Sequence, residues 1–289
     1  MQRKRILITG ANGQLGRELS RLGAVSPNEY IQTDVAELDI TDAAAVLEMA
    51  SNTKAEFIIN CAAYTNVDKA EDDEQTAHLI NCTATANLAA AAKQVGATLI
   101  HVSTDYVFDG CGCTPYTEEA AVAPTGAYGR TKLAGEQAVA ESGCKHIIIR
   151  TAWLYSPFGR NFVKTMRTLT AERELLQVVF DQVGSPTYAG DLADAILHIV
   201  EGGTCEAYGT YHYSNEGVCS WYDFAKEICA ETGSLCVVSP CSTNDYPTNV
   251  RRPQYSVLDK RRFKETFGRD LPHWRDSLSF CIKEIEKFG

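Results

Sequence analysis

The sequence predicts an α/β protein with a doubly wound, Rossmann-like parallel sheet and a smaller C-terminal α/β lobe. Three observations predict this fold class. Short β-rich runs alternate with longer helical stretches in the first half of the chain, those runs are continuously apolar, and a glycine-rich turn follows the first of them. Strict alternation of strand and helix implies parallel strands joined by right-handed crossovers. Continuously apolar strands are typical of a sheet that is covered on both faces.

Hydrophobic periodicity gives the elements in order. In the first half we expect strands at 5–9, 30–34, 57–61, 98–103 and 146–150, and helices at 14–22, 41–50, 75–95 and 127–141. In the second half the pattern is looser, with helices near 160–172, 190–201 and 221–231 and strands near 176–180 and 208–213. A turn-rich stretch at 239–253 then precedes a short C-terminal segment.

Composition and charge exclude several classes of protein. With 45% hydrophobic and 22% charged residues, the chain has the composition of an ordinary folded protein. Its net charge of −10 argues against a general affinity for nucleic acid or for an anionic membrane. No run of about 18 apolar residues is present to span a bilayer. The apolar run near the start, Ile6–Ile8, is too short for the core of a signal peptide.

The cysteines favour a reducing compartment over a disulfide framework. Their number, 11, is odd, and Cys61, Cys82 and Cys229 lie inside apolar segments. Buried thiols of this kind predict a cytoplasmic protein. Cys111 and Cys113 flank one glycine in a polar loop, where they either bind a metal, oxidise or remain plain exposed thiols, and we favour the last. The six histidines show no metal-ligand spacing, so we expect no metal site.

The glycine-rich turn indicates a dinucleotide site. Gly10, Gly13 and Gly16 fall where the first strand turns into the first helix. Glycine lets the backbone approach a pyrophosphate, whose charge the free N–H groups of the helix N-terminus can meet. Asp34 ends the second strand, where a carboxylate can bind ribose hydroxyls and disfavours the extra phosphate of NADP. Arg17 either offsets that preference or is solvated, so we favour NADH over NADPH only slightly.

A second pattern indicates proton-transfer chemistry. Tyr128 and Lys132 are four positions apart at the start of a predicted helix, so they project from one face. A neighbouring cation should lower the pKa of the phenol and make it a usable acid or base. The fourth strand ends at Thr104, which brings a hydroxyl to the carboxyl edge of the sheet. Ligands of open α/β sheets bind at that edge.

With these motifs in place, the sequence resembles the extended, nucleotide-sugar-modifying branch of the short-chain dehydrogenase/reductase superfamily. Within that branch it is similar to the dTDP-4-dehydrorhamnose reductases. The similarity spans nearly the whole chain, and Arg130 is a small departure at a position where that family often has Lys. The segments that carry it are TGANGQLG, NCAAYTNVDKAE, VSTDYVFDG, YGRTKLAGE, RTAWLY and DQVGSPT.

The resemblance implies roles for individual residues. For NADPH or NADH these are Gly10, Gly13, Gln14 and Leu15 at the pyrophosphate, Asp34 at the ribose, Asp39 and Ile40 beside the adenine, Ala63, Tyr64 and Thr65 in the cleft, and Tyr128 and Lys132 at the nicotinamide ribose. For the reaction they are Thr104 on the substrate carbonyl, Tyr128 as proton donor and Lys132 tuning it, with Asp105 and Trp153 against the sugar nucleotide. Trp153 is equally well explained as a core aromatic. Arg251 and Arg252 either clamp a diphosphate or are solvated.

The implied reaction is reduction of the C4 ketone of dTDP-4-dehydro-L-rhamnose, the last step in making dTDP-L-rhamnose for polysaccharide. Three alternatives stay open. Dehydratases of this branch carry a Thr-Asp-Glu triplet, but here the third place is Tyr106. Epimerases run on tyrosine and cofactor alone and hold NAD tightly. A non-catalytic regulatory subunit, like the β subunit of methionine adenosyltransferase, can keep the same tyrosine and lysine.

The resemblance also gives the expected division of the chain. Residues 1–152, completed by parts of 175–212, should form the dinucleotide-binding domain. Residues 153–174 and 213–289 should form the sugar-nucleotide-binding lobe. We expect a small-molecule sugar nucleotide as partner, neither nucleic acid nor membrane, and possible pairing of two copies as a homodimer.

Overall fold

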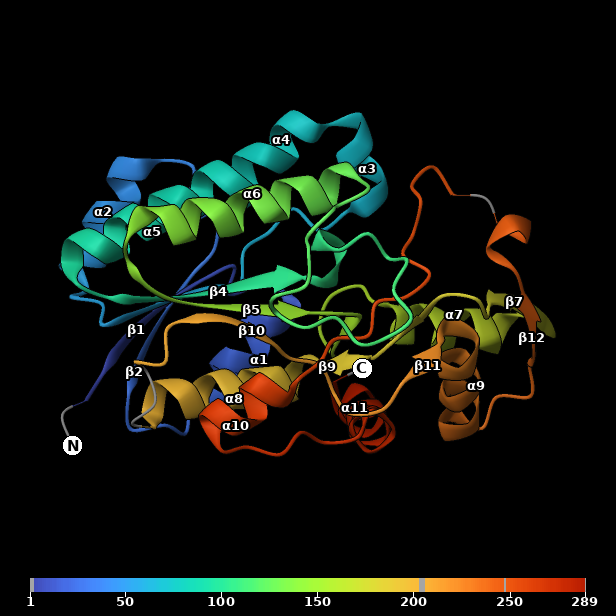
Figure 1. Ribbon diagram of the computed structural model, residues 1–289. Coiled ribbons are helices and arrows are strands. Elements are labelled where there is room, and N and C mark those ends of the chain that lie inside the picture. The colour runs from blue at the N-terminus through green and yellow to red at the C-terminus, as the bar shows by residue number, and fades with distance from the viewer. Residues whose placement is uncertain (1–2, 203–205, 247, 289) are drawn as a thin grey trace.

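The computed structural model describes residues 3–202, 206–246 and 248–288, and a six-stranded sheet forms its centre (Figure 1). All neighbouring strands are parallel, in the order β10-β5-β4-β3-β1-β2. The strands are β1 (Arg5–Thr9), β2 (Glu29–Thr33), β3 (Phe57–Asn60), β4 (Thr98–Thr104), β5 (Lys145–Thr151) and β10 (Gly209–His212). The order reverses beside β1, where open sheets bind ligands outside the carboxyl ends of the strands. This confirms the predicted fold class.

Helices cover both faces of the sheet, because successive side chains of a strand point in opposite directions. In β1, Ile6 and Ile8 belong to one hydrophobic cluster and Leu7 to another. The first cluster includes side chains of α1 (Gln14–Gly23) and α8 (Ala189–Glu201). The second includes side chains of α2 (Ala43–Asn52), α5 (Ala84–Val95) and α6 (Ala127–Ser142). Figure 1 shows the two sets of helices on opposite sides of the strands.

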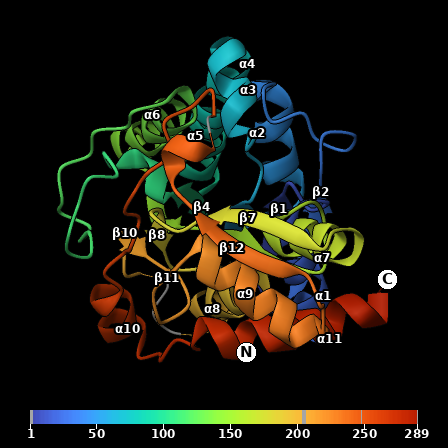
Figure 2. The same ribbon diagram turned by 90° about the vertical axis from the view of Figure 1, so that its right-hand side faces the viewer.

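A second, smaller region follows the strands' carboxyl ends (Figure 2). Its β7 (Leu175–Val179) and β12 (Val237–Cys241) form a parallel pair. Around this pair lie α7 (Phe162–Glu172), α9 (Trp221–Thr232) and α11 (Trp274–Phe288), whose apolar side chains share one core. Two further short pairs are β6 (Leu154–Tyr155) with β9 (Thr187–Tyr188), and β8 (Val183–Gly184) with β11 (Cys219–Ser220). The proposed domain boundaries remain a prediction.

The structure corrects several expected elements. The helix expected over 75–95 is interrupted: α4 (Glu74–His78) is followed by a π-helical turn (Leu79–Thr83) and then by α5, and α3 (Val67–Asp72) precedes them. The turn-rich stretch includes the end of β12, and the C-terminal segment contains α10 (Arg261–Phe267) and α11. Helix α11 has apolar residues at helical spacing, Trp274, Leu278 and Ile282, all buried in the core. No helix in the described ranges combines the length and apolarity needed to cross a bilayer.

Candidate active site at the carboxyl edge

The glycine loop makes a tight cradle between β1 and α1. Gly10 has φ +68°, and a Cβ at that position would lie 2.6 Å from the backbone nitrogen of Ala62. Gly13 is the N-cap of α1 and offers no side chain to the first N–H groups of the helix. An anion of pyrophosphate size could therefore meet bare backbone and open N–H donors. The loop has room for a dinucleotide phosphate, and its role in binding one stays a prediction.

The two loop residues that follow serve different purposes. Leu15 is buried in the sheet core, so only its backbone N–H faces the loop. The Gln14 side chain accepts a hydrogen bond of 3.0 Å from Asn161, the N-cap of α7. Gln14 thereby links the loop to the smaller region. The Arg17 guanidinium lies 5.6 Å from the centre of the Phe158 ring.

Asp34 holds the loop in place from the end of β2. Its Oδ2 accepts from the backbone N–H of Asn12 at 2.9 Å, and its Oδ1 accepts from that of Val35 at 2.8 Å. Each carboxylate oxygen has a further lone pair. The residue is thus placed beside the phosphate loop, where a ribose hydroxyl could still bind.

The remaining cofactor candidates lie on the segments after β2 and β3. Asp39 is exposed, and its hydrogen bonds with Thr41 lower the pKa of its carboxyl. Ile40 is buried in the second core cluster. Ala63 and Tyr64 are half-buried and Thr65 is exposed on the segment that follows β3.

Tyr64 is fixed by a residue of the π-helical turn. Asn81 accepts from its backbone N–H at 2.8 Å and donates to its carbonyl at 3.2 Å. The same amide donates to Thr131 of α6 at 3.1 Å. Asn81 therefore ties the expected cofactor cleft to the helix that carries Tyr128. Asn81 was not among the predicted site residues, and its one signal in the sequence is a polar residue inside an apolar helix.

Thr104 and Tyr128 meet where β4 ends and α6 begins. The two segments pack closely, because a Cβ on Gly129 would clash with the carbonyl of Tyr106. The Tyr106 and Tyr128 rings lie edge to face at 5.4 Å. The Thr104 side chain lies close enough to the Tyr128 phenol to influence its pKa. The structure thus brings together the predicted proton donor and the predicted carbonyl contact.

Burial, and not a neighbouring cation, has the largest effect on the pKa of the Tyr128 phenol. We expected Lys132 to lower its pKa, but burial raises the pKa of Tyr128 well above 10. The nearby Thr104 hydroxyl opposes this shift, and the nearby Asp105 adds to it. The expectation was wrong for the protein alone, because Lys132 directs its Nζ at β4. There it donates to the carbonyl of Val102 at 2.8 Å.

Lys132 is almost fully buried, with 1% of its surface exposed. Burial lowers the pKa of its ammonium to about 8. Glu136, one turn further along α6, acts in the opposite direction. Lys132 is therefore a desolvated cation whose pKa lies close to neutral pH, which is typical of functional sites.

Asp105 is a second buried titratable group at the same edge. Its Oδ1 accepts from the Thr104 hydroxyl at 3.0 Å, whereas its Oδ2 is buried without a hydrogen-bond partner among the residues described. Burial raises the pKa of Asp105 to about 7, and the Thr104 hydrogen bond opposes the shift. An unpaired buried oxygen is unusual and indicates a binding site for a polar group.

Trp153 adopts the left-handed region, with φ +49°, which is uncommon for a large side chain. Its ring stacks on Trp221 at 3.5 Å with an interplanar angle of 7°. It also packs against the cluster of Val107 and Phe108, directly after Asp105. The strained backbone places an aromatic face between the sheet and the smaller region, as expected of either a substrate contact or a core residue.

The two candidate clamp arginines already have partners. Arg252 donates to Asp68 of α3 at 2.8 Å and lies near the Tyr106 phenol, whose pKa it lowers against the effect of burial. Arg251 is exposed and lies 3.5 Å from the Cys111 sulfur. Arg252 therefore ties a segment of the C-terminal half to the sheet domain. Its predicted role as a diphosphate clamp remains a prediction.

Comparison with known proteins agrees with this geometry. A family model described as the RmlD substrate binding domain matches residues 4–287. A dTDP-4-dehydrorhamnose reductase of Burkholderia thailandensis is 40% identical over 97% of this chain and 99% of its own. The chain belongs to the dTDP-4-dehydrorhamnose reductase family.

Two solved members of this family have nearly the same structure. The reductase of Clostridium acetobutylicum is 46% identical, with a TM-score of 0.94 over 98% of this chain and 99% of its own. The reductase of Bacillus anthracis, solved in complex with NADP, is 41% identical, with a TM-score of 0.94 over 98% of this chain and 100% of its own. The resemblance predicted from the sequence motifs is confirmed.

Two buried residues behind the reductase site were not predicted to belong to it. Asn60 ends β3 and lies 3.1 Å from His101 of β4, and His101 lies 3.4 Å from the Nζ of Lys132. No role was predicted for Asn60, and His101 was expected only to pack within its strand. A polar residue at the last position of an apolar strand was the only signal for Asn60.

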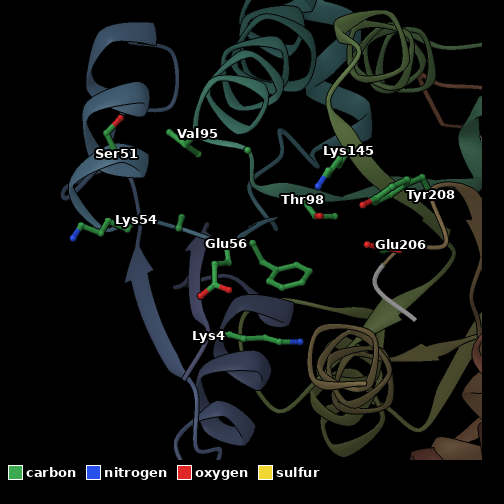
Figure 3. Close-up of a pocket in the computed structure, with 12 residues that line it drawn as sticks. Lys4, Ser51, Lys54, Glu56, Val95, Thr98, Lys145, Glu206 and Tyr208 are labelled. Carbon is green, nitrogen blue, oxygen red and sulfur yellow. The ribbon is translucent and has the colours of Figure 1, made fainter. Parts of the chain in front are cut away.

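One cavity lies away from this site. A cavity of 580 Å³ opens at the amino edge of the sheet, beside the starts of β3, β4 and β5 (Figure 3). Lys54, Glu56 and Lys145 line it and are exposed. Among the described residues, no three His, Cys, Asp or Glu side chains gather as metal ligands would.

Proposed function

We propose that this chain reduces the C4 ketone of dTDP-4-dehydro-L-rhamnose to dTDP-L-rhamnose with NADPH or NADH. The observation that carries the proposal is the joint placement of Thr104, Tyr128 and Lys132 at the carboxyl edge of the sheet. The glycine cradle lies at the same edge, on β1. Dinucleotide and proton donor would then face one substrate.

The reduced nicotinamide, when bound, supplies the hydride that attacks C4. The chain's own groups manage the oxygen. Thr104 orients the substrate carbonyl by a hydrogen bond, and Tyr128 gives its proton to the oxygen as that oxygen gains charge. The raised pKa of Tyr128 keeps the phenol protonated at neutral pH, as a donor must be. Lys132 binds the ribose of the cofactor and stabilises the phenolate that remains.

The other predicted residues would bind the two ligands. The pyrophosphate would lie on the backbone of Gly10 and Gly13, and the ribose near Asp34. The substrate's sugar would lie between Asp105 and Trp153. The free Oδ2 of Asp105 supports this, because a sugar hydroxyl would satisfy it. Asp34 favours NADH, and the NADP of the Bacillus anthracis relative favours NADPH.

The decisive assay uses freshly generated dTDP-4-dehydro-L-rhamnose with NADH and NADPH separately, and follows loss of nicotinamide absorbance. Oxidation coupled to formation of dTDP-L-rhamnose supports the proposal and identifies the cofactor. Binding of either cofactor without oxidation would instead indicate a regulatory subunit. NAD retained through purification, with interconversion of sugar epimers, would indicate an epimerase.

Replacing Tyr128 tests the proposed proton donor. Tyr128→Phe should lower turnover roughly 10³-fold while cofactor binding is retained, because only the transferable proton is removed. Tyr211→Phe is the matched control, since it removes a hydroxyl that bonds the carbonyl of Ala207 in the same domain. It should keep full turnover. Normal turnover by Tyr128→Phe would refute the assignment.

Two coarser expectations belong with this function. Every described cysteine is a free thiol, which supports a reducing, cytoplasmic location. A homodimer remains a prediction, and light scattering on the purified chain would test it.

A further inference from the structure

A row of polar side chains crosses the sheet and ends at Lys132. The strand register pairs Thr9 with Asn60 and Asn60 with His101, so the three lie side by side on β1, β3 and β4. The Thr9 hydroxyl donates to Asn60 Oδ1 at 2.9 Å. His101 connects Asn60, at 3.1 Å, to Lys132, at 3.4 Å. No member of the row is more than 1% exposed.

The orientation of the Asn60 amide follows from its neighbours. The backbone N–H of Ala62 lies 3.1 Å from Oδ1 of Asn60. A backbone N–H can only donate, so the amide oxygen must face it. The amide nitrogen of Asn60 therefore faces His101 and donates to its Nδ1.

This orientation sets the tautomer of His101. Burial, with the nearby Lys132, lowers the pKa of His101 well below 6.5, so the ring is neutral. A neutral imidazole has one N–H, and Nδ1 is occupied as an acceptor. The proton must lie on Nε2, which points at the Nζ of Lys132.

An imidazole N–H cannot accept a proton from an ammonium group. On the side that faces the sheet, Lys132 therefore donates to the carbonyl of Val102 and not to His101. We propose that His101, fixed by Asn60 as an Nε2–H donor, is a positioning residue that turns the other protons of Lys132 away from the sheet, toward Tyr128 and the cofactor. This inference rests on the function proposed for Lys132.

The arrangement also predicts a pH dependence. The titratable groups around Lys132 are His101 on β4, Cys61 after β3, and Glu136 and Tyr128 on α6. Burial lowers the pKa of the ammonium to about 8, and a donor aimed at it acts in the same direction. Turnover should fall on the basic side near that pH, as Lys132 loses its proton.

Asn60→Asp replaces the amide donor that faces His101 with an acceptor and keeps the shape of the side chain. One carboxylate oxygen still accepts from Ala62, and the other must accept from His101 Nδ1. The imidazole proton then moves to Nδ1, and Nε2 presents a lone pair to Lys132. The basic limb of the profile of kcat/KM against pH should shift upward by about one pH unit.

Asn60→Leu makes the same test without adding charge, because Nδ1 of His101 loses its donor, so the imidazole proton can move to Nδ1 and Nε2 can accept from the Lys132 ammonium. We again expect an upward shift. His212→Gln is the matched control: His212 is a fully buried sheet histidine on β10 whose ring bonds the carbonyl of Tyr116. It should lose stability to a similar degree and leave the basic limb unchanged.

The tautomer itself can be observed in the unmodified chain. Long-range proton–nitrogen NMR spectra of histidine-labelled protein should give His101 as the Nε2–H form, and as Nδ1–H in Asn60→Asp. An Nδ1–H form in the wild type, or folded variants whose basic limb does not rise, would overturn the inference. Failure of the proposed function is separate, since it would appear as normal turnover by Tyr128→Phe.

Discussion

The two edges of the central sheet handle polar groups in opposite ways. At the carboxyl edge, the side chains of His101, Lys132 and Asp105 are 0%, 1% and 4% exposed and contact other buried polar groups. At the amino edge, Lys54 and Lys145 line a cavity of 580 Å³ but remain exposed (Figure 3). Both edges carry charged side chains, but only the carboxyl edge buries them away from water.

This difference suggests burial of polar groups, and not the presence of a cavity alone, as the mark of the proposed site. Desolvation disfavours charge, so it shifts the pKa of each group that it encloses. Burial raises the pKa of Asp105 to about 7 and lowers that of Lys132 to about 8. Groups that titrate near neutral pH can exchange protons with a substrate, whereas solvated charges at a rim serve mainly solubility.

The largest effect is expected at Gly10. Gly10→Val combines a positive φ with a Cβ that would lie 2.6 Å from Ala62, so it should close the cradle and weaken NADPH binding by about 100-fold or more. Gly96→Val is the control at the amino edge, where φ is +76° but no atom lies within 4 Å of the added Cβ. Fluorescence titration measures both affinities, and equal losses in the two variants would contradict the comparison.

A smaller effect is expected within one strand, β4. Thr104→Val removes the hydroxyl that lies beside the Tyr128 phenol and should lower kcat by about 10- to 100-fold, with cofactor affinity unchanged. Thr98→Val alters the first residue of the same strand, which is also buried but lies at the amino edge. It should leave kcat unchanged. Steady-state kinetics measure kcat for both variants. Similar losses of kcat would mean that the packing of β4, and not the position of Thr104 at the carboxyl edge, sets the rate.

The sheet was predictable because its signal is local. Most central strands contain a short apolar run, and a turn or helix follows it, so all six strands of the sheet could be placed from sequence to within a residue or two. The π-helical turn was not predictable, since Asn81 bonds Tyr64 and Thr131 from distant segments. Helix α11 was predictable and was missed, although its apolar spacing is regular.

The site was only partly predictable. The spacing of Tyr128 and Lys132 placed both on one face of α6, and Thr104 was correctly placed at the end of its strand. The contact of Asn60 with His101 depends on strand order and register, which the sequence does not encode locally. The direction of the pKa shift at Tyr128 was wrong, because burial outweighed a cation that turns toward the sheet.

Asp105 should affect stability in a pH-dependent way. An unfolded Asp titrates near 3.9, and burial raises the pKa of folded Asp105 to about 7. The folded state therefore binds a proton more tightly, and the free energy of unfolding should fall as the pH rises between those values. Asp105→Asn removes this pH-dependent loss. Its free energy of unfolding should therefore rise by about 1–3 kcal/mol relative to that of the wild type between pH 5 and pH 8. Urea denaturation measures it.

The opposite sign is expected at Asp39, where hydrogen bonds with Thr41 lower the pKa of an exposed carboxyl. Its contribution to stability is present above the unfolded pKa and is lost as the pH falls. Asp39→Asn should therefore lose stability relative to wild type as the pH rises through the acidic range. If both variants changed in the same direction, the contrast between buried and exposed carboxylates would fail.

The smallest effect is expected at the amino-edge cavity. Lys54→Ala and Lys145→Ala remove exposed charges from its lining, so turnover and cofactor affinity should each change by less than about twofold. Because these cations are solvated, their loss leaves no buried partner unpaired and alters no pKa at the opposite edge, which lies a full strand length away. Kinetics with both cofactors test this. A loss comparable to that of Thr104→Val would show that the amino edge contributes to the reaction, and exposure could no longer distinguish the two edges.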